Sequence, residues 1–123
     1  MLIEENTVAD AAVVTAYESG RIEIGATVYT EAVVLRDGEV FPAVLTAPSE
    51  LTSADFLQTA SAAGLPEVII VGTGANQQFL HPKIAAELAA QGMGLECMNT
   101  ASACRTLLLL QGEGRKVWAW LWP

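Results

Sequence analysis

Two glycines close an apolar run in the second half of the chain, in a pattern that could bind phosphate. Gly72 and Gly74 follow residues 68–71, which are all Val or Ile. Phosphate-binding loops often begin in this way, because glycine lets a ligand approach the backbone closely. The residues that follow decide whether the other parts of such a site are present.

A dinucleotide-binding fingerprint fits these following residues poorly. It requires a third glycine for packing of the helix on the strand, and Gln77 occupies that position. Pro82 suits the first position of the next helix, so the helix would begin several residues beyond the loop and away from a bound phosphate. Glu96 does lie about twenty residues farther on, where a ribose-binding acid is expected. An isolated glycine pair is more typical of a sharp turn, and no Lys-Ser or Lys-Thr pair completes a P-loop.

A ligand crevice at one end of the sheet is the alternative that the spacing allows. The glycine loop follows one expected parallel strand, and a helix beginning near Thr100 follows the next. Ligands of open α/β sheets bind outside the carboxyl ends of such strands. The candidate residues for binding a small molecule or an anion, possibly in an enzyme, are Gly72, Thr73, Gly74, Asn76, Thr100 and Arg105.

The remaining chemistry-bearing residues do not form a convergent catalytic set. His81 precedes a proline at a helix start, which favours a capping role over catalysis. Cys104 falls in the first turns of a helix beside Arg105, where its pKa could be lowered, but a free cysteine is more often a small buried side chain. The acidic residues are scattered without metal-ligand spacing. We expect no catalytic residue, no metal and no cofactor.

The composition limits the classes of partner. The 123 residues are 52% hydrophobic and 16% charged, against about 25% charged in typical proteins, so much of the chain must be buried. A net charge of -8 disfavours binding to nucleic acid or to anionic lipid. No apolar run reaches the roughly 18 residues that span a bilayer, and the first residues are acidic. We expect one domain over residues 1–123, a cytoplasmic location and no membrane insertion.

Periodicity predicts a β-rich beginning followed by alternating strands and helices. Two-residue alternation in "RIEI" and "TVYTEAVVL" indicates strands, with reversals at Gly25 and at Asp37-Gly38. Thr52 and Asp55 resemble a capping box that opens a helix ending near Gly64. Two further helices are expected from Pro82 to Gly92 and, capped by Thr100, as far as Gly112. The helices alternate with strands at "EVIIVG", "LECM" and "KVWAWLWP", which indicates βαβ units and a largely parallel sheet.

Two segments carry more apolar surface than one core contact requires. Trp118, Trp120 and Trp122 share one face of the last strand, and each would bury roughly 150 to 250 Å² when covered. We expect a helix of the same chain to cover Trp118 and Trp120, and leave Trp122 open. Residues 107–110 are four consecutive leucines, which extend around more than one side of a helix. The candidate partner surface is Leu108, Leu109, Trp120 and Trp122.

The second half of the chain resembles a small family of unknown function. Its members include a mitochondrial respiratory complex I assembly factor and an adipogenesis-associated domain protein. The resemblance lies in "EVIIVGTG" and "GMGLECMNTASACRTLLLLQGEGRKVWAWLWP", and is looser at "IEIGATVYTEAVVL". The matching positions are Gly72, Thr73, Gly74, Gly92, Met93, Glu96, Thr100, Ala103, Cys104, Thr106, Glu113 and, displaced by one residue, Arg115. Leu107, Leu108 and Asn99 depart from the family's aromatic residue, asparagine and aspartate.

The resemblance implies an α/β fold: a three-layer α/β/α-type sandwich with a mixed central sheet and an N-terminal β-hairpin region. It also implies no established catalytic activity, and an assembly role for the mitochondrial members. Together with the apolar surplus, this favours a non-enzymatic interaction or assembly protein that binds a protein partner or self-associates. The alternative is a small-molecule or anion-binding protein that uses the glycine-loop crevice.

Overall fold

The computed structural model describes residues 13–58 and 64–123, which form two β-sheets and three α-helices. The smaller sheet consists of β1 (Val14–Glu18), β2 (Arg21–Ile24) and β3 (Thr27–Tyr29). The larger sheet consists of β4 (Val33–Arg36), β5 (Glu39–Pro42), β6 (Val68–Thr73), β7 (Gly94–Met98) and β8 (Val117–Trp122). The helices are the 3-10 turn η1 (Pro48–Glu50), α2 (Ser53–Leu57), α3 (Pro82–Ala89) and α4 (Thr100–Gly112).

The larger sheet is mixed, with strand order β5-β4-β8-β6-β7. β6 pairs in parallel with both β7 and β8, whereas β4 pairs antiparallel with β8 and β5. Every residue of β6 is buried, as the uninterrupted run of Val68 to Val71 predicts for a strand covered on both faces. The prediction of a mixed α/β sheet is therefore confirmed.

Both predicted reversals near the N-terminal side of the chain are present. Asp37 and Gly38 have φ values of 53° and 79°, which is the left-handed pair that a two-residue hairpin requires, and they join β4 to β5. Gly25, with φ of 61°, lies in the turn between β2 and β3. The first third of the chain thus forms hairpins because glycine and aspartate tolerate positive φ at these positions.

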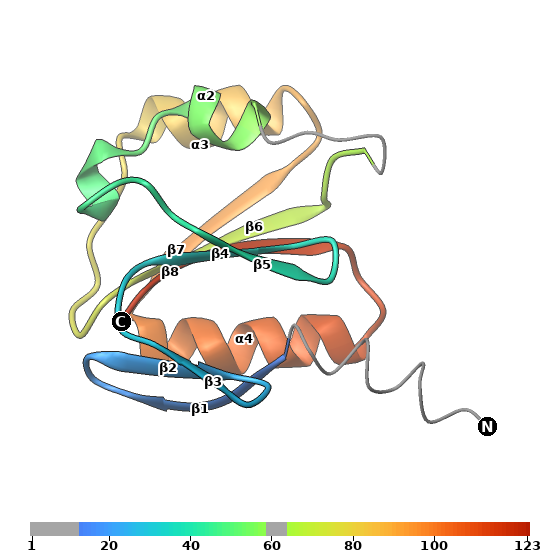
Figure 1. Cartoon of the computed structure of the whole chain (residues 1–123). Coiled ribbons are helices and arrows are strands. Elements are labelled where there is room, and N and C mark those ends of the chain that lie inside the picture. The colour runs from blue at the N-terminus through green and yellow to red at the C-terminus, as the bar shows by residue number, and fades with distance from the viewer. Residues whose placement is uncertain (1–12, 59–63) are drawn as a thin grey trace.

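Secondary structure is arranged in layers around the five-stranded sheet (Figure 1). α2 and α3 lie over one face, and α4 together with the three-stranded sheet lies over the other. Each face has its own hydrophobic cluster, one containing Phe56, Leu88 and Ile69, the other containing Ile22 and Leu107. The three-layer prediction is confirmed, with the small sheet as an addition to the helical layer below.

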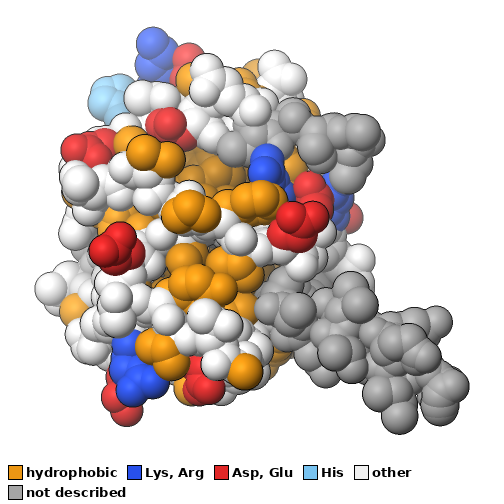
Figure 2. Space-filling view, in the orientation of Figure 1, with side chains coloured by type: hydrophobic (Ala, Val, Ile, Leu, Met, Phe, Trp, Pro, Cys, Tyr) orange, Lys and Arg blue, Asp and Glu red, His pale blue; other side chains and the backbone are white. Residues whose placement is uncertain are grey.

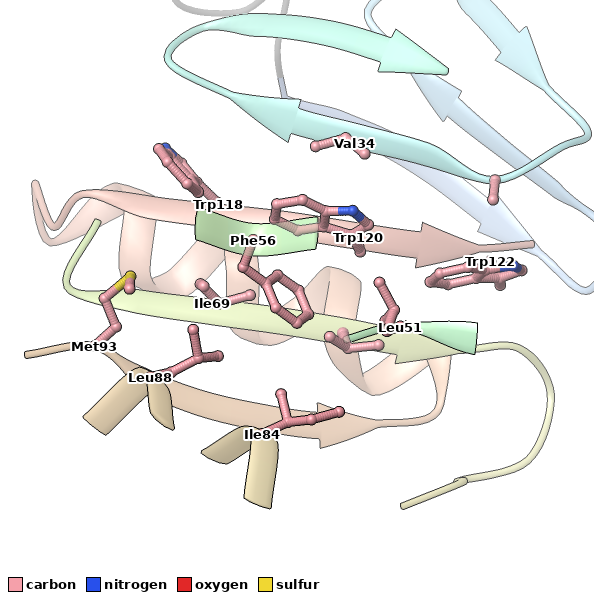
Figure 3. Packing of buried hydrophobic residues seen from close by; sticks show 12 residues of the cluster. Val34, Leu51, Phe56, Ile69, Ile84, Leu88, Met93, Trp118, Trp120 and Trp122 are labelled. Atoms are coloured by element: carbon pink, nitrogen blue, oxygen red, sulfur yellow. The ribbon is translucent and has the colours of Figure 1, made fainter. Parts of the chain in front are cut away.

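The tryptophans of β8 are part of the core (Figure 3). Trp118, Trp120 and Trp122 are 0%, 3% and 8% exposed, on the face covered by α2 and α3. The ring of Phe56 packs edge-on against Trp120, with centroids 4.7 Å apart. The expected cover of Trp118 and Trp120 by a helix of the same chain is confirmed, and Trp122 is buried as well. The inclusion of Trp120 and Trp122 in a partner surface was therefore wrong, because the chain itself covers both. The alternate residues of β8, Ala119 and Leu121, are buried on the opposite face.

The helix starts agree with the sequence at two positions and differ at one. The Thr52 N–H donates to Asp55 Oδ2 at 2.7 Å at the start of α2, as the capping box predicts. Pro82 is the first residue of α3 and directly follows the N-cap residue His81. α4 is capped by Asn99, whose Oδ1 accepts from the Ser102 N–H at 2.8 Å, and not by Thr100 as expected. Residues 59–63, where α2 was expected to continue, lie outside the described residues.

Candidate functional site

The glycine loop packs against α4 with little space between them. A Cβ atom added to Gly72 would lie 3.0 Å from Ala103 Cβ, Leu121 Cδ2 and Thr100 Oγ1. This glycine therefore serves close packing of helix against strand, because no side chain fits between them. Gly74 has φ of 93°, which turns the chain away from the end of β6.

Hydrogen bonds within the loop occupy the hydroxyl of Thr73, one of the groups that were expected to bind a ligand. Thr73, 3% exposed, donates from Oγ1 to the Asn76 carbonyl at 2.7 Å and accepts from the Gln78 N–H at 3.0 Å. The Asn76 side chain lies in an exposed stretch. The loop is thus held in shape by its own side chain and backbone.

Thr100 joins the loop to both α4 and the last strand. Its hydroxyl accepts from the Gly74 N–H at 2.7 Å and donates to the Trp122 carbonyl at 2.5 Å, while its own N–H donates to the Gly74 carbonyl at 2.8 Å. The side chain is 0% exposed. Because both hydroxyl functions are already used inside the protein, this residue is a structural bridge between three segments.

Arg105 is the one member of the predicted crevice that faces another part of the molecule. Its guanidinium donates from Nη2 to Ser102 Oγ at 3.1 Å, and the residue lines a groove of about 260 Å³ between α4 and β1. The prediction that the glycine loop and Thr100 lie together is therefore correct. Arg105 instead lies on the side of α4 that faces β1.

His81 and Cys104 have structural surroundings. His81 Nδ1 accepts from the Lys83 N–H at 3.1 Å, which confirms the expected capping role. Cys104 is 8% exposed, and burial raises the pKa of its thiol to about 11, although Arg105 acts in the opposite direction. A thiol with so high a pKa is protonated at neutral pH and is a poor nucleophile.

A polar cluster that the sequence did not reveal lies between α2 and α3. Ser53 Oγ donates to Glu87 Oε1 at 2.6 Å, in a pocket of about 350 Å³ that His81 and Lys83 also line. The serine and the glutamate are 34 residues apart, so only the packing of the two helices shows the pair. The hydroxyl hydrogen is directed to the carboxylate, and this pair joins the helices.

The consecutive leucines of α4 differ in burial, because some face the core and others face the surface. Leu107 is 1% exposed, whereas Leu108 and Leu109 are 51% and 64% exposed. Leu108 lines the groove beside β1 and also an adjoining groove of about 500 Å³ toward the end of the helix. The predicted partner surface is thus reduced to Leu108 and Leu109.

A second apolar region lies at the β5 edge of the large sheet. Figure 2 shows hydrophobic side chains gathered over the middle of the face that is also seen in Figure 1. A hollow of about 370 Å³ at β5 is lined by Val34, Phe41 and Leu45, with Val44 94% exposed beside them. β5 ends at Pro42, which lacks an N–H and so protects this edge from pairing.

Neither a metal-binding cluster nor a membrane-spanning helix is present among the described residues. Within residues 13–58 and 64–123, no group of three or more His, Cys, Asp and Glu side chains is placed to hold a metal ion. Across the same residues, no helix has both the length and the apolar character needed to cross a bilayer. The groove between α4 and β1, which Leu108 and Arg105 line, is therefore the candidate binding surface.

Comparison with known proteins places this fold in a family. A family model described as protein of unknown function (DUF498/DUF598) matches residues 14–122. The chain belongs to this family. A family relative from Bordetella parapertussis, known from a crystal structure, is 38% identical, with a TM-score of 0.81 over 90% of this chain and 94% of that one. A Mth938-like domain of Bordetella pertussis, solved by NMR, is 30% identical, with a TM-score of 0.74 over 95% and 87% of the two chains.

Curated relatives of the family include assembly factors. The mouse protein named NADH dehydrogenase (ubiquinone) 1 alpha subcomplex assembly factor 3 is 37% identical over 57 residues, which are 46% of this chain and 31% of that protein. The zebrafish protein of the same name is 39% identical over 57 residues, 46% and 33% of the two chains. The match therefore spans about a third of the length of these assembly factors.

Proposed function

We propose that this protein is a non-enzymatic interaction protein that assists assembly of a multi-subunit complex. The observation that carries the proposal is the pair of exposed leucines, Leu108 and Leu109, on α4. Adjacent leucines at the surface, next to apolar grooves, are typical of a protein contact. The names of the mouse and zebrafish relatives support assembly of NADH dehydrogenase as the finer form of this proposal.

The surroundings of the chemistry-bearing residues support the same proposal. Thr73 and Thr100 use their hydroxyls inside the fold, and His81 accepts from a backbone N–H. Cys104 is buried and holds a protonated thiol at neutral pH. A catalytic site would need an acid or base directed at an accessible nucleophile, and none of these four residues provides one.

Loss of the gene tests the assembly role directly. In cells of the source organism that lack the protein, we expect less fully assembled NADH dehydrogenase on native gels, with its subunits still synthesised. The wild-type gene should restore assembly, and the double variant Leu108→Glu, Leu109→Glu should restore it poorly, although the purified variant folds. A normal amount of assembled enzyme in the deletion strain would contradict the finer proposal.

Ligand screening separates this function from small-molecule binding. We expect no thermal shift with nucleotides, flavins or sugar phosphates, because the glycine-loop groups are bonded to each other. A ligand present at 100 times its dissociation constant would stabilise the protein by about 2.7 kcal/mol. A shift of that size that is lost in Asn76→Ala would identify the protein as a ligand-binding protein of the class considered as the alternative.

A further inference from the structure

Two grooves along α4 meet at Leu108, which lines both, and together they are named the α4–β1 channel. The shorter part lies between the helix and β1 and is lined by Ala16, Tyr17 and Ala101, among others. The longer part continues to Gln111 and Gly112. Together they follow the helix for about 18 Å at 1.5 Å per residue. An extended segment of about five residues covers that length, at 3.3 Å per residue.

The strand beside this channel has backbone available for pairing. Among the described residues, β1 is hydrogen-bonded on one side only, to β2, and forms the edge of the order β1-β2-β3. An edge strand next to a helix can accept an added strand, whose main chain pairs with the edge and whose side chains contact the helix. β5 is also an edge, but Pro42 limits pairing there.

An acceptor in the channel wall is left without a donor. The Gln111 Oε1 atom is buried and has no hydrogen-bond partner within the described part of the chain. A buried acceptor without a partner is unfavourable, and a donor from a bound segment would satisfy it. This observation is independent of the exposed leucines and of the edge strand.

The charges of the channel differ from those of the rest of the protein. Of six basic residues in the chain, Arg115 lines the longer part of the channel and Arg105 the shorter part. Arg36 also borders the longer part, but its guanidinium lies over the rings of Phe41 and Trp118, on the face of the sheet that α2 and α3 cover. Of the acidic residues in the described ranges 13–58 and 64–123, only Asp37 is among the lining residues. The ion pair of Arg115 with Glu67, at 3.2 Å, is exposed and therefore weak. The shorter part therefore has the basic residue Arg105 and no acidic residue among its described lining residues, which favours an acidic group of a partner there.

We propose that the α4–β1 channel binds an extended segment of a partner protein that alternates apolar and acidic residues, as a fourth strand on β1. Apolar side chains of the segment contact Leu108, and an acidic side chain pairs with Arg105. The inference rests on the proposed interaction function and names the surface and the chemistry of the partner.

Synthetic peptides test the chemistry without knowledge of the partner. The probe is a fluorescein-labelled octapeptide of alternating valine and glutamate, and its control replaces glutamate with lysine. We expect the full-length protein to bind the glutamate peptide at least tenfold more tightly in fluorescence anisotropy. General attraction to a protein of charge -8 would favour the lysine peptide, so the opposite preference requires local basic groups. Equal binding, or tighter binding of the lysine peptide, would overturn the proposal.

Matched variants locate the binding site. Leu108→Glu and Arg105→Glu should each weaken binding of the glutamate peptide about tenfold. Leu109→Glu should change it less than about twofold, since Leu109 is exposed but is not among the lining residues. If Leu109→Glu and Leu108→Glu weaken binding equally, the contact is a general apolar surface and the channel proposal is wrong.

Backbone methylation tests whether the peptide pairs as a strand. A glutamate peptide with N-methyl groups on alternate residues cannot donate along one edge, and we expect at least tenfold weaker binding. Amide chemical shifts of residues 14–18 should change on adding the unmethylated peptide. Shifts confined to other segments would overturn strand addition.

Two further outcomes separate this inference from its rivals. If sedimentation shows a dimer that Leu108→Glu dissociates, the occupant is a second copy and the proposal of a partner peptide is wrong. If the deletion strain loses assembled NADH dehydrogenase but Leu108→Glu and Arg105→Glu restore it fully, the assembly function stands and the channel does not serve it. If the peptides bind as expected but the deletion strain is normal, the channel stands and the assembly function fails.

Discussion

Strand β8 and helix α4 both have apolar residues on more than one side, but they differ in how many of these residues are buried. Both faces of β8 are covered, with Trp118 toward α2 and α3 and Leu121 toward α4, each 0% exposed. α4 buries Leu107 and leaves Leu108 and Leu109 at the surface. A strand inside a layered sheet is enclosed on both faces, whereas a helix in an outer layer has one covered face. Apolar residues on two sides are therefore all buried in β8, whereas in α4 those on one side are exposed.

The two sides of the large sheet also differ in how closely the next layer approaches. On the tryptophan side, large rings such as Trp120 and Phe56 fill the space beneath α2 and α3. On the other side, Gly72 and Ala103 allow α4 to lie close to the sheet. The close side is also where Thr100 bridges three segments.

The largest effect is expected from truncation of the buried tryptophan. Trp118→Ala removes a side chain that is 0% exposed and should lower the free energy of unfolding by about 3 to 5 kcal/mol. Leu109→Ala, at a residue 64% exposed, should change it by less than about 0.5 kcal/mol. Urea denaturation followed by circular dichroism measures both. Similar losses for the two variants would remove the contrast between β8 and α4.

Filling the close contact beneath α4 should have the next largest effect. Gly72→Ala places a methyl group 3.0 Å from Ala103, Leu121 and Thr100, and should cost about 1 to 3 kcal/mol through overpacking. The control is Gly112→Ala at the end of α4, where no atom lies within 4 Å of the added Cβ. That variant should be neutral or stabilised by up to about 1 kcal/mol, because alanine favours helix. If Gly72→Ala is as stable as the wild type, the layers are not in close contact.

Removal of the bridging hydroxyl should cost a similar or slightly smaller amount. Thr100→Val keeps the shape of the side chain but leaves the Gly74 N–H and the Trp122 carbonyl without this partner, a loss of about 1 to 3 kcal/mol. Thr106→Val in the same helix removes only a contact of 3.5 Å with the Met98 sulfur and should cost less than about 1 kcal/mol. Equal losses in thermal unfolding would show that the hydroxyl bridge has no special contribution.

The smallest effect concerns the thiol on the covered side of α4. Burial raises the pKa of Cys104 from about 9 to about 11, so the folded state holds the proton at a pH where the unfolded chain releases it. The resulting contribution is complete below about pH 9 and is lost as the pH rises toward 11. Cys104→Ala should therefore lose less stability than the wild type across this interval in urea titrations. Parallel curves would show that the thiol is not buried in solution. Burial and, to a smaller extent, the Cys104 thiolate also raise the pKa of Tyr17, so Cys104→Ala removes part of the Tyr17 contribution as well and makes the difference between the two proteins larger.

The sequence predicted structure correctly where the conformation depends only on neighbouring residues. Asp37-Gly38 predicted a tight reversal, and both residues have positive φ. The uninterrupted run at Val68–Thr73 predicted a strand covered on both sides, and every residue in it is buried. Alternation along β8 placed its tryptophans together on one face. These features follow from backbone sterics and from the two-residue period of strands.

The candidate site was predictable only in part. The glycine loop and Thr100 do meet, because parallel strands end at the same edge of the sheet. The sequence could not show that Thr100 uses both hydroxyl functions internally, or that Asn99 caps the helix in its place. Of the four residues predicted for a partner surface, Leu108 and Leu109 are exposed, whereas Trp120 and Trp122 are buried, since their burial depends on where α2 and η1 pack.

By itself, the amino-acid sequence determined the elements of this protein, their order and the faces on which apolar side chains lie, because these depend on neighbours within a few residues. The tertiary structure alone decided which apolar faces are covered, and it brought β1 beside α4 although Tyr17 and Arg105 are far apart in the chain. Burial and charge in a groove are properties of surfaces that meet only after the chain has folded. For this reason the channel along α4 is visible in the fold and absent from any stretch of sequence.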